Sequence, residues 1–308
     1  LNNVLADDGE KTRADHRHHA IDALAVACTH SGMTHKLSRY WEDRDNVRAQ
    51  KPILQQPWDS IRVDAEKAVD AIIVSHRVRK KVSGALHKET VYGDTQIDVS
   101  TKSGTYRQFV TRKKVEALSK GELGDIRDDR TREIVTEWVT SRGGDPKKAF
   151  PPYPKMGESG LEIRKVRLTS KQQIKLMAPV ATGFADLGSN HHIAIYQTRE
   201  GKVEFEVVSL FEAAGRLSKH LPVVRRLRED GATFALSLAA GDTIEFLEDE
   251  KKKLRIVQSI WSSGVIVTVE HTDAEGASIW RPSASSLVKG GAKKIAVDPI
   301  GRIRSAND

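Results

Sequence analysis

Residues 15–23 read DHRHHAIDA, the stretch of this sequence with the most specific chemistry. Asp15 is a candidate N-cap, and the apolar residues that follow it predict a helix over residues 15–38. Residues three apart share a helix face, so His19 and Asp22 project the same way near the helix start. The apolar residues at helical spacing are Ile21, Leu24, Ala25 and Cys28.

A carboxylate beside an imidazole can serve hydrolysis. Carboxylate oxygens are preferred ligands of Mg²⁺, and an imidazole with an ordinary pKa of about 6.5 can take a proton from water. One interpretation of the pair is therefore a self-contained metal-dependent phosphohydrolase built on His18, His19 and Asp22. The other is a helix start with exposed histidines. The phosphohydrolase needs further His or Asp ligands downstream, and none stands out at a telling spacing.

The composition is typical of a globular protein of about two domains, since 308 residues carry 38% hydrophobic and 30% charged side chains. The longest apolar runs fall far short of the ~18 residues of a membrane-spanning helix. A single cysteine, Cys28, excludes an intrachain disulfide and a Cys-based zinc cluster. The N-terminus has no signal-peptide pattern. These features favour the cytoplasm, a reducing compartment.

Basic residues gather in clusters that the net charge of +8 does not reveal. Such clusters are typical of proteins that bind a phosphate backbone, although a solvated surface explains any single cluster as well. The cluster members are Arg77, Arg79, Lys80, Lys81 and Lys88; Arg107, Arg112, Lys113 and Lys114; Arg164, Lys165 and Arg167; Lys219, Arg225, Arg226 and Arg228.

The rest of the pattern predicts an α+β protein. Before residue 160 it indicates helices over 58–71 and 128–142, a short strand at 72–74, strands over 90–99 and 106–115, and a Pro-rich connector at 150–154. A polar stretch at 41–56 separates the first two helices. After residue 160 short strands dominate: 193–198, 203–208, 234–238, 243–247, 255–261, 265–271, 278–281 and 293–297, with a helix over 209–218.

Several segments together resemble the type II CRISPR-associated RNA-guided DNA endonucleases known as Cas-nine. RHHAIDA at 17–23 resembles the third segment of the family's RuvC-like nuclease domain, and residues 74–93 resemble the start of its wedge region. SNHHIAIY at 189–196, EVVSLFEAA at 206–214, and Ser237-Leu238 followed by Gly241-Asp242 resemble its C-terminal region. The order of these segments matches the smaller, type II-C members, and the resemblance spans nearly the whole chain.

The resemblance implies an architecture. We expect helices of an incomplete RNase-H-like (RuvC-like) nuclease domain over 1–71, a mixed wedge region over 72–160, and a β-rich domain over 161–308 that interacts with the protospacer-adjacent motif. The chain begins at Leu1 without an initiator Met, and we expect it to be part of a longer protein. Without the RuvC-like sheet, the apolar stripe of the first helix would face no partner, so residues 1–70 would be loosely held or dock elsewhere.

The resemblance also implies roles for the residues of the first motif. His19 would activate the attacking water and Asp22 would be a metal ligand, in a two-metal hydrolysis of phosphodiesters with Mg²⁺, or Mn²⁺. The family completes this site with an Asp and a Glu from earlier segments that this chain does not show. We therefore expect Asp22 to bind metal only with those carboxylates, and the isolated chain to be inactive.

Guide RNA, target double-stranded DNA and the missing N-terminal part of the same protein are the implied partners, in the cytoplasm of a prokaryote with a role in antiviral defense. No membrane partner is implied. Arg77, Arg79, Lys80 and Lys81 would contact the RNA or DNA backbone. Candidates for reading bases in the adjacent motif are Gln258, Ser259, Trp261, Ser262, Ser263 and Arg281.

Some alternatives stay open at this point. A protein that retains these domains without catalysis would bind guide RNA or duplex DNA and cut neither. Trp261, taken alone, is more typical of a core residue than of a base contact. His191 and His192 are more typical of a strand edge than of a metal site.

Overall fold

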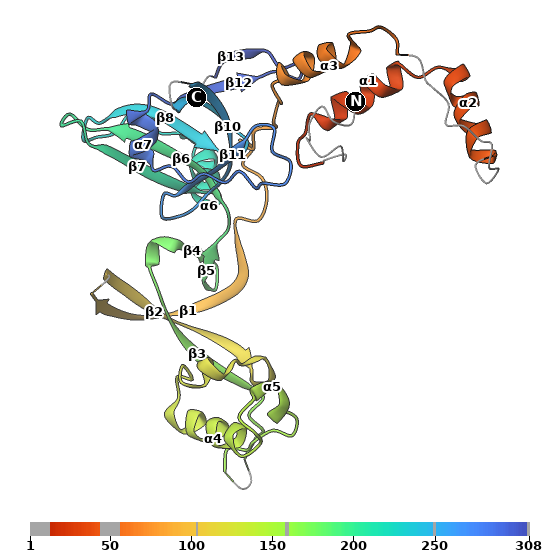
Figure 1. Cartoon of the computed structure of the whole chain (residues 1–308). Coiled ribbons are helices and arrows are strands. Elements are labelled where there is room, and N and C mark those ends of the chain that lie inside the picture. The colour runs from red at the N-terminus through yellow and green to blue at the C-terminus, as the bar shows by residue number, and fades with distance from the viewer. Residues whose placement is uncertain (1–12, 44–55, 103, 158–159, 249–250, 307–308) are drawn as a thin grey trace. The chain divides into compact units, whose positions relative to one another are not determined.

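The computed structural model describes residues 13–43, 56–102, 104–157, 160–248 and 251–306 (Figure 1). The chain forms two compact units. Unit 1 combines Leu1–Lys81, Asn190–Val208 and Val224–Asp308, and unit 2 combines Val82–Ser189 and Ser209–Val223. No helix within the described residues is long and apolar enough to cross a membrane. The mixture of helices and antiparallel sheets confirms the predicted α+β class.

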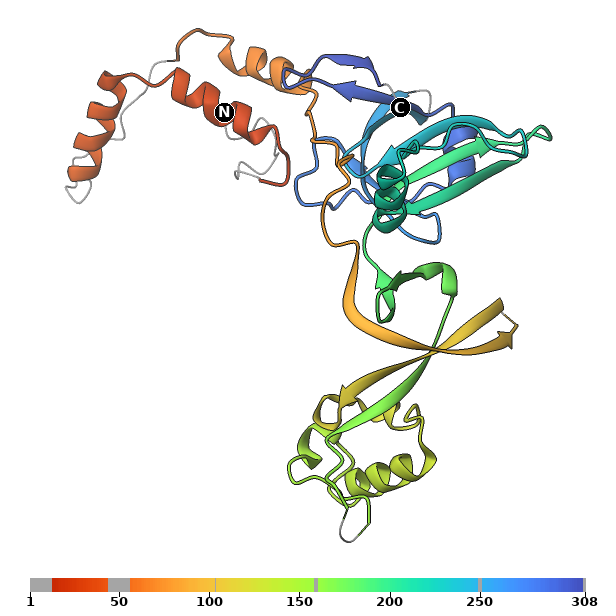
Figure 2. The ribbon, with the colours of Figure 1, turned by 180° about the vertical axis from the view of Figure 1, so that it is seen from behind.

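Unit 1 contains two antiparallel sheets and several helices, seen from two sides in Figures 1 and 2. One sheet has the strand order β7-β6-β8 and the other the order β11-β10-β9-β12-β13. Its helices are α1 (His18–Ala27), α2 (Ser31–Glu42), α3 (Ile61–Asp70) and α7 (Ala284–Lys289). Its strands are β6 (Asn190–Gln197), β7 (Val203–Ser209), β8 (Thr233–Ala239), β9 (Thr243–Glu248), β10 (Lys251–Ile260), β11 (Ile266–Glu270), β12 (Lys293–Val297) and β13 (Ile303–Ser305).

The core of unit 1 packs the two sheets and α7 against each other. Ile193 and Ile195 of β6 meet Leu236 and Leu238 of β8, together with apolar residues of the second sheet and Leu287 of α7. Strand β6 is central in its sheet and buried from His191 to Tyr196, which explains its nearly continuous apolar run. His191 and His192 therefore lie inside the unit, and the prediction of a strand edge is wrong.

Unit 2 is built around a long hairpin. Its sheet has the order β3-β2-β1-β5-β4, and β1 pairs with β5 through its first half and with β2 through its second. The elements are β1 (His87–Thr101), β2 (Gly104–Lys114), β3 (Lys165–Gln172), β4 (Met177–Val180), β5 (Gly183–Leu187), α4 (Asp129–Thr140), α5 (Pro146–Ala149), α6 (Leu210–Ser218) and 3-10 turns at Val115–Ala117, Lys120–Leu123 and Ile174–Leu176.

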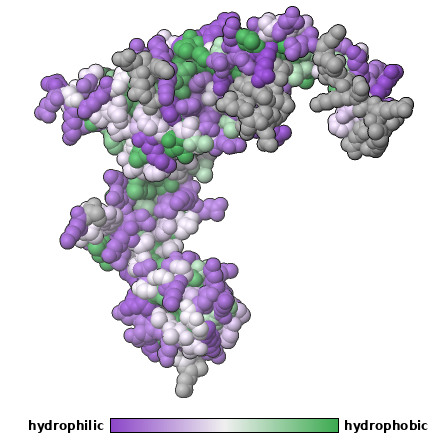
Figure 3. Space-filling view, viewed as in Figure 1, coloured by the Kyte–Doolittle hydropathy of each residue, from purple (hydrophilic) through white to green (hydrophobic). Residues whose placement is uncertain are grey.

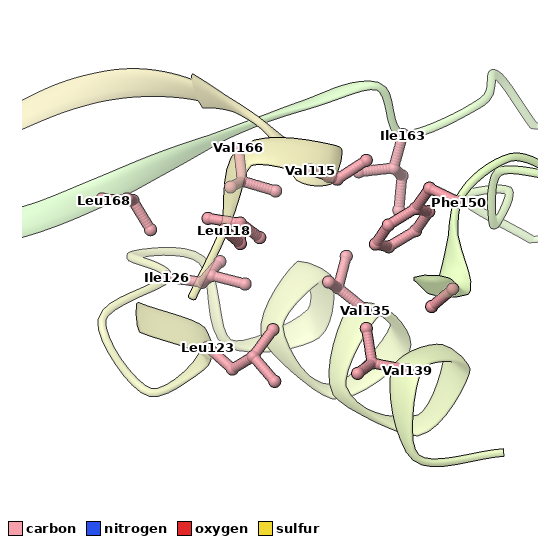
Figure 4. Packing of buried hydrophobic residues seen from close by; sticks show 11 residues of the cluster. Val115, Leu118, Leu123, Ile126, Val135, Val139, Phe150, Ile163, Val166 and Leu168 are labelled. Carbon is pink, nitrogen blue, oxygen red and sulfur yellow. The ribbon is translucent and has the colours of Figure 1, made fainter. Parts of the chain in front are cut away.

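A second core lies where α4 covers the ends of β2 and β3. Val135 and Val139 project from α4 toward Val115, Leu118 and the ring of Phe150 (Figure 4). The predicted helix over 128–142 is confirmed as α4. It begins after Asp128 because the Asp128 side chain accepts a hydrogen bond from the Thr131 amide and caps the helix. Ser209 and Glu212 form a capping box that starts α6 where the sequence places it.

The N-terminal region differs from its prediction. The single helix predicted over 15–38 is two helices, since the chain is extended at His30 and the Thr29 hydroxyl donates to the Ala25 carbonyl at the end of α1. Asp15 precedes α1 without capping it, and Arg17 occupies the N-cap position. Ile21 is buried, whereas Ala25 of the same predicted stripe is exposed. Most of the polar stretch predicted at 41–56 lies outside the described residues.

Two predicted strands are absent from the described structure, and several elements were missed. Residues 72–74 are extended but unpaired with a strand, because the Val74 amide donates to Nδ1 of His271 instead. Residues 278–281 contribute only a bridge between Trp280 and Thr268. Strands β3, β4, β5 and β13 and helices α5 and α7 were not predicted, and all of them except β3 are short.

Candidate functional site

The start of α1 is held by contacts with two distant segments of unit 1. The His16 amide donates to the Thr272 carbonyl (2.8 Å), and the Ala274 amide donates to the Ala14 carbonyl (2.8 Å). The Arg17 guanidinium binds both carboxylate oxygens of Asp15 and lies 3.4 Å from the Val69 carbonyl at the end of α3. These contacts fix the direction in which α1 leaves residue 17.

Asp15 is an ionised anchor of this arrangement. Burial by itself would raise the pKa of Asp15, but the hydrogen bonds from Arg17 outweigh burial and hold that pKa below its ordinary value. The carboxylate therefore stays charged at neutral pH, and its ion pair with Arg17 (2.7 Å) persists.

The two histidines of the motif differ in their surroundings. Nδ1 of His18 lies 2.5 Å from the Asp15 carbonyl, which can only accept, so this nitrogen carries the proton. His19 is exposed, and its ring centroid lies 3.9 Å from that of His18. His18 is thus a structural residue, while His19 keeps its ring accessible to solvent and to a substrate.

His19 and Asp22 lie on α1 three residues apart, with Asp22 half-buried. His19 lines a pocket of about 620 Å³ together with His76 and Arg77 from the extended segment after α3. A single carboxylate does not enclose a divalent ion. In the part of the chain that the structure describes, no three His, Cys, Asp or Glu residues are placed to hold a metal.

Three histidines meet beside this pocket. The ring centroids of His16 and His76 are 5.4 Å apart, and Nε2 of His76 donates to the His271 carbonyl (2.7 Å). Burial, followed by the neighbouring His76, holds the pKa of His16 below its ordinary value of 6.5. Burial, followed by Arg17 and His76, does the same to the pKa of His271. Burial therefore disfavours the charged form of His16 and of His271.

The four predicted backbone-contact residues lie on one extended segment of unit 1. Arg77, Arg79 and Lys81 are exposed there, and the Arg79 amide donates to the Ala240 carbonyl (2.7 Å). Lys80 differs from them, because its ammonium lies 3.9 Å from the carboxylate of Asp242. Arg77 is the member that also borders the pocket of His19.

The predicted base-reading residues gather around the end of β10. Trp261 is 49% exposed, so it is not a core residue, and the guanidinium of Arg281 lies 5.9 Å from its ring centroid. Ser262 is held by hydrogen bonds with Asn190, whereas Ser263 is exposed. Gln258 is exposed on β10 and Ser259 is half-buried beside it. The structure brings Trp261 and Arg281 together.

A basic face in unit 2 joins two clusters that lie far apart in the sequence. In the pairing of β2 with β3, Arg112 lies opposite Arg167 and Lys114 opposite Lys165. The side chains of Val166 and Leu168 point to the core, so the alternate residues form the outer face. We call this outer face the cationic ladder; its members are Arg112, Lys114, Lys165, Arg167 and Lys171.

Other members of the same sequence clusters are neutralised by carboxylates. Arg107 contacts Asp94 and Asp98, Lys113 contacts Glu122 (2.6 Å), and Arg164 contacts Glu162 (2.8 Å). Within the described residues, no carboxylate lies within ion-pair distance of a ladder cation. Sequence reasoning named the clusters but missed this division, which the alternation of side chains along each strand could have revealed. The face of the molecule shown in Figure 3 is largely hydrophilic over both units.

Known proteins resemble the chain in sequence near its N-terminus and in fold over almost all of it. Residues 2–83 match the family described as RuvC endonuclease subdomain 3. The CRISPR-associated endonuclease Cas9 of Campylobacter jejuni is 32% identical over 93 residues, a match that covers 26% of this chain and 10% of the relative.

Solved structures extend the likeness of fold. Cas9 of Streptococcus thermophilus, in complex with the AGAA PAM, superposes with a TM-score of 0.58 at 14% identity, over 97% of this chain and 33% of that one. The type II-C Cas9 of Actinomyces naeslundii gives a TM-score of 0.55 at 15% identity, over 99% of this chain and 38% of that one. The chain thus spans about a tenth of the curated relative and about a third of these structures. The predicted resemblance is confirmed.

Proposed function

We propose that this chain, which resembles the C-terminal part of the type II CRISPR-associated endonucleases of the Cas9 family, supplies one segment of a RuvC-like nuclease site and the nucleic-acid-binding region that accompanies it. The match of residues 2–83 to RuvC endonuclease subdomain 3 carries this proposal. Guide RNA and target duplex DNA are the proposed partners, in the cytoplasm of a prokaryote. The complete protein would hydrolyse phosphodiester bonds in DNA.

The proposed roles in hydrolysis follow from exposure and chemistry. His19 has an accessible imidazole that can accept the proton of an attacking water, and Arg77 borders the same pocket with a permanent positive charge. Asp22 would hold a divalent ion, Mg²⁺ or Mn²⁺, together with carboxylates supplied from other segments of a complete site. When bound, the ion supplies charge stabilisation for the phosphate oxygens.

One carboxylate and one imidazole do not hold two metal ions, and we therefore propose that the 308-residue chain alone does not cut DNA. Incubation of the purified chain with plasmid and Mg²⁺ should leave the plasmid supercoiled. Co-expression with a polypeptide that carries the earlier RuvC segments should restore cutting, and Asp22→Ala should abolish it. Plasmid cleavage by the isolated chain that is lost in Asp22→Ala would show instead a self-contained phosphohydrolase.

A non-catalytic nucleic-acid-binding protein is the second candidate, favoured by the exposed cations that the pairing of β2 with β3 gathers on one face. Complementation separates the two candidates. If cutting does not return when the earlier segments are supplied, while RNA binding is intact, the chain is a binding protein.

The cationic ladder and the segment with Arg77, Arg79 and Lys81 are the proposed contacts for phosphate backbones. Each cation that contacts a phosphate contributes roughly −0.9 to the slope of log K against log salt for a duplex. Arg112→Ala should therefore flatten the slope for an RNA duplex by about one unit. Arg164→Ala is the matched control, because Glu162 already neutralises this residue, and it should leave the slope unchanged. Equal effects of the two changes would exclude the ladder as the contact.

The residues at the end of β10 are the proposed readers of a short duplex motif. Arg281 can bond the edge of a guanine and Gln258 that of an adenine, and the exposed Trp261 can support the guanidinium of Arg281. The test lets the complete nuclease select cleavable targets from a library whose flanking sequence is randomised. Arg281→Ala should change which flanking sequences are preferred, whereas Lys289→Ala, on α7, should leave that preference unchanged.

A further inference from the structure

A basic pocket lies at one end of the cationic ladder, inside unit 2. It has a volume of about 680 Å³, and four of its lining residues are cations from separate segments: Arg112 on β2, Arg127 before α4, and Lys165 and Arg167 on β3. The Arg127 amide donates to the Arg167 carbonyl (2.9 Å), so the segment before α4 runs along the free edge of β3. Backbone pairing therefore fixes the positions of all four residues relative to one another.

The arrangement of these cations is unfavourable unless an anion is bound. Arg112 and Arg167 are directly opposite across the strand pair, where like charges repel each other. The pocket contains one carboxylate, Asp128, which caps α4 by accepting from the amide and the hydroxyl of Thr131 and which offsets part of the charge of Arg167. An excess of positive charge thus remains in the pocket, which suits a phosphate group.

The pocket also has an exposed apolar side chain in its lining, which a site for phosphate alone does not need. Met156 is 39% exposed in the lining, whereas Ile126 and Val166 border the pocket with their side chains buried in the core under α4. Methionine offers a polarisable surface for an aromatic ring, and guanidinium planes stack on bases. The volume falls within the roughly 300–1,000 Å³ of ordinary small-molecule sites.

We propose that this pocket binds a single nucleotide turned out of a nucleic-acid helix, with its phosphates on Arg112 and Arg167 and its base against Met156. The remaining ladder cations, Lys114 and Lys171, lie outside the pocket and would contact the helical backbone on either side. The proposal rests on the proposed nucleic-acid binding of unit 2 and adds recognition of an unstacked base. A bulge in RNA and a bulge in DNA offer the same chemistry, and the test distinguishes them.

The test measures binding of the full 308-residue chain to fully paired duplexes and to the same duplexes with one extra unpaired 2-aminopurine, in RNA and in DNA. The expected preference for the bulged duplex is about tenfold, the scale of one stacked base. The fluorescence of 2-aminopurine should change on binding, because the base leaves its helical neighbours. The nucleic acid that shows the preference identifies the source of the nucleotide.

Three substitutions separate the pocket from the ladder. Met156→Ser changes no charge and should abolish the preference for the bulge while leaving the salt slope for the paired duplex unchanged. Arg167→Ala should abolish the preference for the bulge and weaken the binding of both duplexes. Lys171→Ala, on the same face outside the pocket, should weaken the binding of both duplexes equally and leave the preference for the bulge unchanged.

The outcomes also separate this proposal from the one on which it rests. Binding of paired duplexes without any preference for the bulge, in the unsubstituted chain, overturns the nucleotide pocket and leaves the proposed function standing. Loss of the preference in Lys171→Ala but not in Met156→Ser overturns the location. No binding of either duplex overturns both proposals.

Discussion

The carboxylate of Asp242 lies 3.2 Å from the ammonium of Lys294, and both side chains are almost completely buried in unit 1. Asp242 also accepts a hydrogen bond from the Ala239 amide (2.7 Å), and Lys294 donates to the Ser237 carbonyl (2.8 Å). The pair therefore fastens β12, which belongs to the larger sheet, to the end of β8 in the other sheet.

Asp242→Ala should lower the free energy of unfolding by about 3–5 kcal/mol, because it leaves the Lys294 ammonium buried without its counter-charge. The matched control is Lys252→Ala, which removes an exposed ion pair with Glu245 and should cost about 0–1 kcal/mol. Urea unfolding followed by circular dichroism gives both values. A loss below about 1 kcal/mol in Asp242→Ala would show that the pair is not desolvated in solution.

Leu118→Ala should destabilise unit 2 by about 2–5 kcal/mol, since Leu118 has no exposed surface and its loss leaves a cavity under α4. Leu161→Ala is the control within the same unit, because Leu161 is 89% exposed and its truncation should be nearly neutral. Thermal unfolding followed by circular dichroism compares the two. Similar melting temperatures would show that the cluster in Figure 4 does not stabilise the fold.

Asp273 should make unit 1 sensitive to acid. Burial would raise the pKa of Asp273, but hydrogen bonds from Ser278 and the following amides outweigh it and lower the pKa from 3.8 to about 2. Because folding lowers the pKa of Asp273, its carboxylate stabilises the folded state at pH values above the unfolded pKa of 3.8. This stability is lost as the pH falls from 3.8 to about 2. Asp273→Asn should therefore be less stable than the unsubstituted chain at pH 5, and the two unfolding midpoints should converge near pH 2. A constant difference between those limits would contradict the assignment.

The docking of residues 14–16 onto the turn at 272–274 should weaken in mild acid. His16 and His271 have a pKa below 6.5 in the folded state, so the undocked state binds more protons as pH falls below 6.5. The protection factor of the His16 amide, which donates to Thr272, should drop between about pH 7.5 and 5.5. The Arg79 amide, bonded to Ala240, should keep its protection over this range. A rise in protection at His16 would reverse the proposed sign.

The sequence predicted those elements whose local signals agree with their tertiary partners. Strands β1 and β2 pair along two stretches of β-type sequence, and α4 has Asp128 as a cap and an apolar face that meets a core. Prediction failed where a distant side chain or carbonyl satisfied the backbone. Nδ1 of His271 accepts the hydrogen bond from the Val74 amide, which a neighbouring strand would otherwise have accepted. The sequence around Val74 contains no signal of this distant partner.

For the candidate site, the sequence predicted which residue types carry the chemistry, but it did not predict which of these residues lie together in the fold. The spacing of His19 and Asp22 on one helix followed from periodicity, whereas Arg77 reaches the pocket of His19 only through the tertiary fold. The sequence places Arg112 and Arg167 in separate clusters, because 54 residues of chain lie between them, but the register of β2 with β3 places them opposite each other. Trp261 was judged by its hydrophobicity, but it lies at a strand end where the core does not extend.

The bond between the His16 amide and the Thr272 carbonyl joins residues at opposite ends of the chain. A ribosome adds about 5–20 residues per second, so His16 emerges roughly 10–50 s before its partner exists. During that interval the helix with His19 and Asp22 lacks its contacts with Thr272 and Ala274, whereas the strands of unit 2 are already synthesised. The hydrogen bond that fixes the start of this helix therefore forms only after most of the chain has been synthesised.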